Sequence, residues 1–163
     1  MAKEIKRDWH LVDVGGRVLG RAIPEIARLL QGKHKVNYVS YLDIGDYVVV
    51  INAKKVVVTG KKSKSKVYTY FSGYPGGLRS VVYSEMLKNK PEEIIRHAVS
   101  GMIPKNKHRD RRLARLYIFG DEKHTYEDRF KNDKSPSFVP LSETTEGKQI
   151  TNVKKHGKED KKS

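Results

Sequence analysis

The fold of this chain is decided by the segment WHLVDVGGRVLGRAIPEIARLLQG, residues 9–32. Its first six residues are predicted to form a strand that ends at the pair Gly15 and Gly16, because glycines interrupt strand patterns. The apolar residues that follow fall at i, i+3, i+4 and i+7, which is one face of a helix: Ile23, Ile26, Ala27 and Leu30. Pro24 is expected in the first turn of this helix, and Gly32 at the position just after its end. The segment therefore predicts a strand–turn–helix unit.

The residues that follow continue to alternate between strand and helix patterns. Runs rich in Val, Ile, Tyr and Phe predict further strands at residues 46–51, 55–60, 67–71 and 116–119. The first two of these runs lack polar alternation, which is typical of strands buried on both faces. Helical spacing returns at residues 83–87 and again after Pro91, where the helix is expected to end at Gly101 and Pro104. Strands that alternate with helices predict a layered α/β domain with a largely parallel sheet.

Apolar residues are spread unevenly along the chain. Hydrophobic residues make up 37% of the 163 residues and charged residues 33%, and few of the hydrophobic ones fall after residue 130. A segment so poor in apolar side chains cannot form a packed core. We therefore expect one folded domain at residues 1–122, followed by a polar, flexible C-terminal tail at residues 123–163.

The chain is strongly basic. It has 34 Lys and Arg residues against 19 Asp and Glu residues, which gives a formal net charge of +15 at pH 7. A charge of this size attracts polyanions and opposes compaction unless a partner neutralises it. The composition therefore favours a nucleic acid as the partner.

Several classes of protein are excluded by what the sequence lacks. With no cysteine, the chain cannot carry a disulfide framework, a cysteine-ligated zinc ion, an iron–sulfur cluster or a catalytic thiol. No apolar run approaches the roughly 20 residues of a membrane span. The first ten residues resemble neither a signal peptide nor a transit peptide. We expect a soluble protein that does not bind membranes and stays in the compartment where it is made.

A nucleotide-handling enzyme is the alternative that the glycine-containing turn raises, because glycine-rich helix starts bind phosphate. The spacing argues against it: a dinucleotide fingerprint needs glycine where Arg17 stands, and a P-loop needs Lys-Ser/Thr where Arg21 and Ala22 stand. No two histidines have metal-binding spacing, and Asp43 and Asp46 have the pattern of a turn. We expect no catalytic residue, no metal, no cofactor and no small-molecule substrate. A small phosphate- or nucleotide-binding α/β enzyme remains the second hypothesis.

Basic residues concentrate in three segments: GKHK at residues 32–35, GKKSKSKVYTYFSGYPGG at residues 60–77 and PKNKHRDRRLAR at residues 104–115. The first has a simple explanation as a solvated helix end. In the second, lysines are expected to meet phosphates, while Tyr68, Tyr70 or Tyr74 stack on unpaired bases or pack on the core. The third holds six Lys and Arg residues against one acid, too many to be paired along one helix. The three segments together favour RNA.

The order of these motifs resembles one family. WHLVDVGGRVLGRAIPEIARLLQGKHK, DIGDYVVVINAKKVVVTGKK, KVYTYFSGYPGG and HAVSGMIPKNK followed by RLARLYIF are similar, over residues 5–122, to the bacterial and organellar type of large-subunit ribosomal protein thirteen. The resemblance implies a three-layer α/β/α sandwich around a mainly parallel sheet of about four strands. It also implies a non-catalytic protein of the large subunit that binds large-subunit ribosomal RNA and supports early assembly and translation. Its expected place is the ribosome of a bacterial cytoplasm, or of an organelle matrix.

The expected partners are this RNA and neighbouring large-subunit proteins, with messenger RNA as a further possibility. The residues predicted to bind RNA are Arg17, Arg21, Lys33, His34, Lys35, Lys61, Lys62, Lys64, Lys66, Ser72, Gly73, Tyr74, Gly76, Gly77, Arg79, Lys105, Lys107, His108, Arg109, Arg111, Arg112 and Arg115. The sequence departs from the family at Tyr74-Pro75, where relatives commonly have a histidine-containing loop. It departs again at residues 106–110, where a glycine-containing segment is common.

Overall fold

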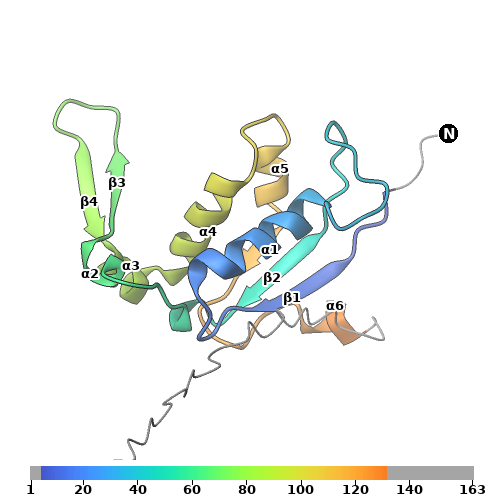
Figure 1. Cartoon of the computed structure of the whole chain (residues 1–163), viewed down its shortest axis with the longest axis horizontal. Helices are drawn as coiled ribbons and strands as arrows, with labels where there is room; N and C mark the ends of the chain where they lie inside the picture. Colours follow the sequence, from blue (N-terminus) through green and yellow to red (C-terminus); the bar gives the residue numbers. More distant parts are fainter. Residues whose placement is uncertain (1–4, 132–163) are drawn as a thin grey trace, which may run out of the picture.

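A computed structural model describes residues 5–131 of the chain (Figure 1). Its elements follow in the order β1 (Trp9–Asp13), α1 (Leu19–Gln31), β2 (Tyr47–Ile51), the 3-10 helix η1 (Ala53–Lys55), α2 (Lys62–Ser65), β3 (Val67–Phe71), β4 (Leu78–Val82), α3 (Tyr83–Asn89), α4 (Pro91–Met102), α5 (Arg109–Leu113), β5 (Leu116–Ile118) and α6 (Glu127–Lys131). No helix among the described residues is long and apolar enough to cross a membrane.

The main sheet is parallel and has the strand order β1-β2-β5. The predicted α/β class with a mainly parallel sheet is therefore confirmed, although this sheet has three strands rather than about four. Helices α1 and α4 lie on one face of the sheet and α6 lies on the other (Figure 1). Alternate residues of each strand face opposite layers, so β1 turns Val12 toward the helical side and Trp9 toward the other side.

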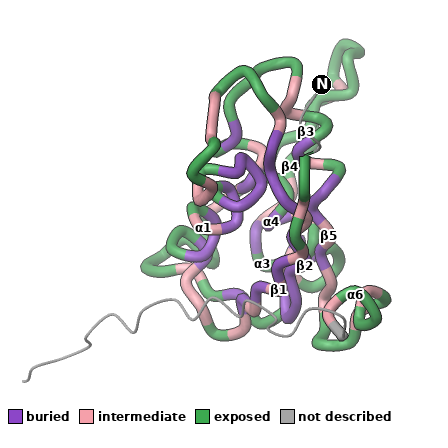
Figure 2. Tube along the Cα trace, turned by 90° about the vertical axis from the view of Figure 1, so that its right-hand side faces the viewer, coloured by how far each residue is buried: buried purple, intermediate pink, exposed green. Residues whose placement is uncertain are grey.

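The hydrophobic core lies between the sheet and the two long helices. Its fully buried side chains include Ile23, Ile26 and Leu30 of α1, Ile94, Ile95 and Val99 of α4, and Val12, Val48 and Val50 of the strands. In Figure 2 the central strands and the inner sides of α1 and α4 are buried, whereas the β3–β4 pair and α6 are largely exposed. The apolar stripe predicted at residues 23–30 is thus the face that α1 packs against the core.

Aromatic side chains cover the opposite face of the sheet. The ring of Trp9 stacks on Tyr47, with centroids 4.5 Å apart, and lies 5.3 Å from the ring of Tyr126 and 6.4 Å from that of Phe130. Tyr117 of β5 joins the same cluster. The segment that follows β5 therefore packs on the sheet beyond residue 122, where we placed the domain boundary. Residues 132–163 of the predicted tail lie outside the described residues.

The segment at residues 55–60 is not the strand we predicted. Asn52 adopts a left-handed conformation with φ 60°, and η1 follows directly, so the backbone leaves the sheet after β2. What remains of the pairing is one isolated parallel bridge between Val57 and Val18. The backbone of Val57 bonds to Arg17 and Leu19 instead of extending the sheet, and Val56 is buried in the core.

The strand predicted at residues 67–71 is present as β3, but it belongs to a separate antiparallel pair with β4. We did not predict β4, because its residues LRSVV lack the apolar alternation of a half-buried strand. The pair stands away from the main sheet (Figure 1), and most of its residues are exposed. It forms a hairpin whose tip is the loop at residues 72–77.

Two helix boundaries differ from the prediction. Helix α1 begins at Leu19, so Pro24 lies inside the helix and not in its first turn. The early start follows from the extended Val18, whose neighbour Leu19 donates its N–H to the carbonyl of Val57. Helix α4 runs through Gly101 to Met102. Two other predictions are confirmed: Pro91 begins α4, and Gly32, which is left-handed with φ 77°, follows the end of α1.

Candidate nucleic-acid interface

The glycine-containing turn between β1 and α1 is closed by the protein's own hydrogen bonds. Gly15 donates its N–H to Asp13 Oδ1 at 2.8 Å, and Gly16 donates to the carbonyl of Lys55 at 3.0 Å. The N–H groups of Arg17 and Leu19 are donated to the carbonyls of Val14 and Val57. A phosphate cradle needs such groups free to face the ligand. The turn therefore serves to connect β1 to α1, and these bonded N–H groups do not form a phosphate site.

Arg17 and Arg21 lie at this turn and in the first turn of α1. Arg21 is exposed, whereas Arg17 is half-buried beside Glu25. Burial raises the pKa of the Glu25 carboxyl, and the nearby positive charges of Arg17 and Arg28 act against that rise. Arg21 is thus the one of the two predicted arginines that the structure leaves fully accessible.

The GKHK segment after α1 is largely occupied by internal contacts. His34 Nε2 lies 2.8 Å from Asp46 Oδ2, and Lys35 forms an ion pair with Asp46 Oδ1. Lys35 also donates to the carbonyl oxygens of Lys6, at 2.9 Å, and Ile44, at 3.2 Å. The charge of Lys35 is already neutralised, which argues against its predicted contact with RNA, and the imidazole of His34 is turned to the same carboxylate. Lys33 alone is exposed and free of an ion pair.

Asp46 is the centre of this cluster. It is fully buried, His10 Nε2 lies 3.0 Å from its Oδ2, and Asp8 donates its backbone N–H to Oδ1 at 3.1 Å. Burial alone would raise the pKa of Asp46, but hydrogen bonds from His10, Lys35 and the Asp8 amide lower it to about 2. The carboxylate therefore stays ionised and joins β1, the segment after α1 and the start of β2.

The same cluster contains the ligand types of a metal site. The ligand atoms of His10, His34 and Asp46 lie within 4.8 Å of one another, and imidazole and carboxylate suit transition metals. Sequence spacing could not reveal this cluster, because His10 and His34 are 24 positions apart and only the fold brings them together. Both oxygens of Asp46 already have protein partners, so the network is complete as an ion-pair cluster.

Three of the four lysines in residues 61–66 are accessible. Residues 62–65 form the short helix α2, and Lys61, Lys62 and Lys64 are exposed. Lys66 is partly buried, and its ammonium lies 5.0 Å from the centre of the Tyr68 ring. Tyr68 itself is only 4% exposed. Of the two alternatives that we gave for this tyrosine, the structure selects packing.

The hairpin tip at residues 72–77 is open to solvent. Gly77 donates its N–H to the carbonyl of Tyr74 at 2.9 Å, and Ser72 donates to the carbonyl of Gly77 at 3.2 Å. Gly73 and Gly76 are left-handed, with φ 87° and 72°, which explains why glycine stands at both positions. The side chain of Tyr74 is 73% exposed. Its neighbour Phe71, which we did not select, is 69% exposed.

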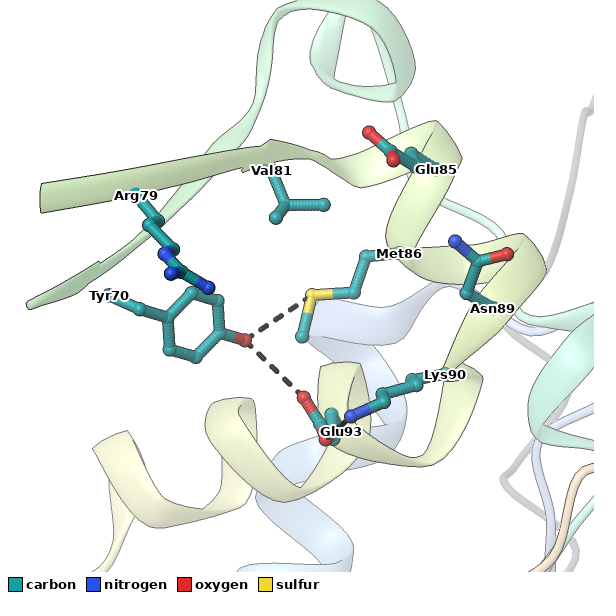
Figure 3. Close-up of a pocket in the computed structure, with 8 residues that line it drawn as sticks. All are labelled: Tyr70, Arg79, Val81, Glu85, Met86, Asn89, Lys90 and Glu93. Atoms are coloured by element: carbon teal, nitrogen blue, oxygen red, sulfur yellow. Dashed lines mark hydrogen bonds and ion pairs between the residues drawn. The ribbon is translucent and has the colours of Figure 1, made fainter. Parts of the chain in front are cut away.

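Arg79 lies farther down the hairpin, at a pocket of about 470 Å³ between the hairpin and helices α3 and α4 (Figure 3). Tyr70 points into this pocket, and its hydroxyl donates to Glu93 Oε2 at 3.5 Å and approaches the sulfur of Met86 at 3.7 Å. Glu85 and Glu93 line the same pocket. The surroundings of Arg79 therefore carry both signs of charge, and Tyr70 is used to hold the hairpin against the helices.

The basic segment at residues 105–115 is divided between the surface and the core. Arg112 and Arg115 are only 1% and 7% exposed, and both guanidinium groups face the carboxylate of Asp43. Arg109 donates to the carbonyl of Ser100 at 2.9 Å. Their charges are buried and neutralised within the domain, which argues against the predicted contacts of Arg112 and Arg115 with RNA. Lys105, Lys107 and Arg111 remain exposed, and His108 is half-buried.

Apart from Arg79, the predicted cations that the structure leaves exposed, together with the partly buried Lys66, fall into two groups. The first, which we call the tip surface, comprises Lys33, Lys105, Lys107, Arg111 and the hairpin loop at residues 72–77. The loops that follow α1, β3 and α4 all project toward the same side of the domain, which is the top in Figure 1. The second, the base surface, comprises Arg21, Lys61, Lys62, Lys64 and Lys66, where α2 meets the foot of the hairpin. Within residues 5–131 none of these cations forms an ion pair.

Comparison with known proteins identifies close relatives. The family model described as Ribosomal protein L13 matches residues 7–125. A protein of Clostridioides difficile named large ribosomal subunit protein uL13 is 50% identical over 123 residues, which cover 76% of this chain and 86% of the relative. Proteins of the same name from Thermoanaerobacter sp. and Rubrobacter xylanophilus are 46% and 49% identical, covering 78% and 76% of this chain and 90% and 86% of the relatives.

Proposed function

This chain belongs to the ribosomal protein L13 family, and we propose that it acts by binding large-subunit ribosomal RNA through its tip and base surfaces. The family match confirms the resemblance drawn from the order of the motifs. It identifies a structural, non-enzymatic protein of the large ribosomal subunit.

The single observation that carries the proposal is the division of the basic residues by the fold. Asp43 and Asp46 neutralise the cations that lie inside the domain, namely Lys35, Arg112 and Arg115. The cations of the two surfaces lack such partners within the described residues. Unpaired cations on a rigid frame attract phosphates and release the counterions of the RNA. The domain therefore serves as a spacer that carries positive charge to converging RNA strands.

Three further roles belong to the same proposal. Neutralising converging strands would help the RNA to pack, which supports a role early in subunit assembly. Neighbouring large-subunit proteins are expected partners, and the same basic surfaces could also bind a messenger RNA. The three relatives above come from bacteria, which supports a place in the cytoplasmic ribosome.

The alternative enzyme hypothesis is disfavoured by the turn after β1. The N–H groups of Gly15, Gly16, Arg17 and Leu19 are bound to protein oxygens, which leaves too few amides at this turn to cradle a phosphate as a glycine-rich loop does. A phosphate- or nucleotide-binding enzyme on this domain would need another site.

The proposal is tested by filter binding of the full chain to transcribed large-subunit ribosomal RNA between 50 and 200 mM salt. If six to ten phosphates are contacted, the affinity should fall by roughly 10³ to 10⁵ over this range. A short duplex RNA of equal nucleotide concentration should compete poorly. Affinity that does not change with salt, or equal competition by the duplex, would contradict the proposal.

A further inference from the structure

A second pocket lies at the base surface. Its volume is about 410 Å³, and it is formed by the first turn of α1, the segment after η1, α2 and the last turns of α4. This volume is within the roughly 300–1,000 Å³ range of pockets that hold small organic groups. We propose that it holds one unpaired nucleotide of the bound RNA. The inference rests on the function proposed above and names a site within it.

The floor of the pocket is apolar. Ile23, Val58 and Met102 line it, and Met102, the last residue of α4, is 46% exposed. A flat base can cover such a surface through the dispersion contacts that a polarisable methionine sulfur makes with aromatic rings. His97 stands at the same pocket and presents an imidazole. These side chains could contact a nucleobase bound in the pocket.

The rim of the pocket carries positive charge only. Lys62 and Lys66 line it, and no carboxylate lies among the residues that form it. Neither lysine has an ion-pair partner within residues 5–131. The pocket beside Arg79 differs, because two glutamates line it. An apolar floor below two unpaired ammonium groups matches a base with its flanking phosphates, as in the recognition of unpaired RNA nucleotides.

Two glycines leave the pocket open. A Cβ built on Gly20 of α1 or on Gly101 of α4 would meet no atom within 4 Å, and both residues line the pocket. Both lie inside helices, where glycine is less favourable than other residues. A Cβ is therefore accommodated at either position, and a leucine there would place its side chain at the wall of the pocket. This makes the site testable without disturbing the lysines.

The experiment measures binding of the full chain to transcribed large-subunit ribosomal RNA for Gly20→Leu and Gly101→Leu. Ser84→Leu is the matched control, because Ser84 is an exposed residue of helix α3 outside the pocket. Stacking of one base accounts for roughly 5- to 150-fold in affinity, so we expect each pocket variant to bind at least about fivefold more weakly. The control should bind like the unmodified chain, and all three variants should melt no lower than it.

The salt dependence separates the base from the phosphates. Gly101→Leu should leave the slope of log affinity against log salt unchanged, whereas Lys62→Gln should reduce it by about 0.7–0.9. Unmodified affinity in both glycine variants would overturn the nucleotide site while leaving RNA binding by the chain intact. Failure of the unmodified chain to bind the RNA would overturn the proposed function and this inference with it.

Discussion

Arg115 donates two hydrogen bonds to the carboxylate of Asp43, with nitrogen–oxygen distances of 2.6 and 2.7 Å, across 72 positions of the sequence. Arg112 approaches the same carboxylate at 3.4 Å. Burial alone would raise the pKa of Asp43, but the two guanidinium groups hold it below its usual value. One aspartate therefore ties α5 to the segment between α1 and β2, and so fixes two of the three segments of the tip surface relative to each other.

Asp43→Ala should destabilise the domain severely. The substitution would leave two buried guanidinium groups without a counter-charge, and breaking a buried pair in this way costs about 3–5 kcal/mol. Urea unfolding measures the loss. Asp121→Ala is the control, because its ion pair with Lys54 is exposed and is worth less than about 1 kcal/mol. Equal stabilities of the two variants would contradict the structural role of Asp43.

The stability of the domain should fall in acid because of Asp46. Its pKa is about 2 in the folded chain and about 3.9 in an unfolded one. A lowered pKa stabilises the fold fully above the unfolded value, and this contribution is lost as the pH falls from about 4 to about 2. It amounts to about 2–3 kcal/mol. Urea midpoints measured through this window should show a smaller pH dependence in Asp46→Asn, and an unchanged dependence would refute the assignment.

Exposed lysines should govern RNA affinity without affecting stability. The double variant Lys105→Gln, Lys107→Gln should reduce the slope of log affinity against log salt by about 1.5. Its unfolding free energy should not change, because neither lysine is buried or paired. The control is Lys88→Gln, Lys123→Gln, which removes the same charge from exposed sites outside both surfaces. If the two double variants lose affinity equally, net charge and not contact determines binding.

Tyr126→Ala should weaken the outer layer of the sheet. Tyr126 lies against the rings of Trp9 and Tyr117, so its removal should cost about 1–3 kcal/mol. Trp9 is the single tryptophan of the chain, and its fluorescence should shift to the red as water reaches the ring. Tyr41→Ala removes a tyrosine that is 71% exposed and should leave both readouts unchanged. An unshifted spectrum in Tyr126→Ala would show that this segment does not cover the sheet.

The elements that the sequence predicted well are those with strong local signals. Helix α1 was predicted from the apolar stripe Ile23, Ile26 and Leu30 and from the glycine after it. The start of α4 was predicted from Pro91. Both predictions succeeded because helical periodicity and helix caps depend on residues only a few positions apart. Residues 55–60 misled the prediction because a β-branched run shows strand propensity but not the turn at Asn52 that removes the segment from the sheet. The strand β4 was missed since its exposed residues carry no alternation.

Sequence by itself determined the α/β class and the family, and it indicated an anionic partner, because periodicity, motif order and net charge can be counted along the chain. Only the tertiary structure decided which cations are free to meet that partner. Lys35, Arg112 and Arg115 look no different in sequence from Lys33, Lys105 and Arg111. They differ because Asp46 and Asp43 reach them across 11, 69 and 72 positions inside the fold, and a buried charge must be paired whereas an exposed one need not be.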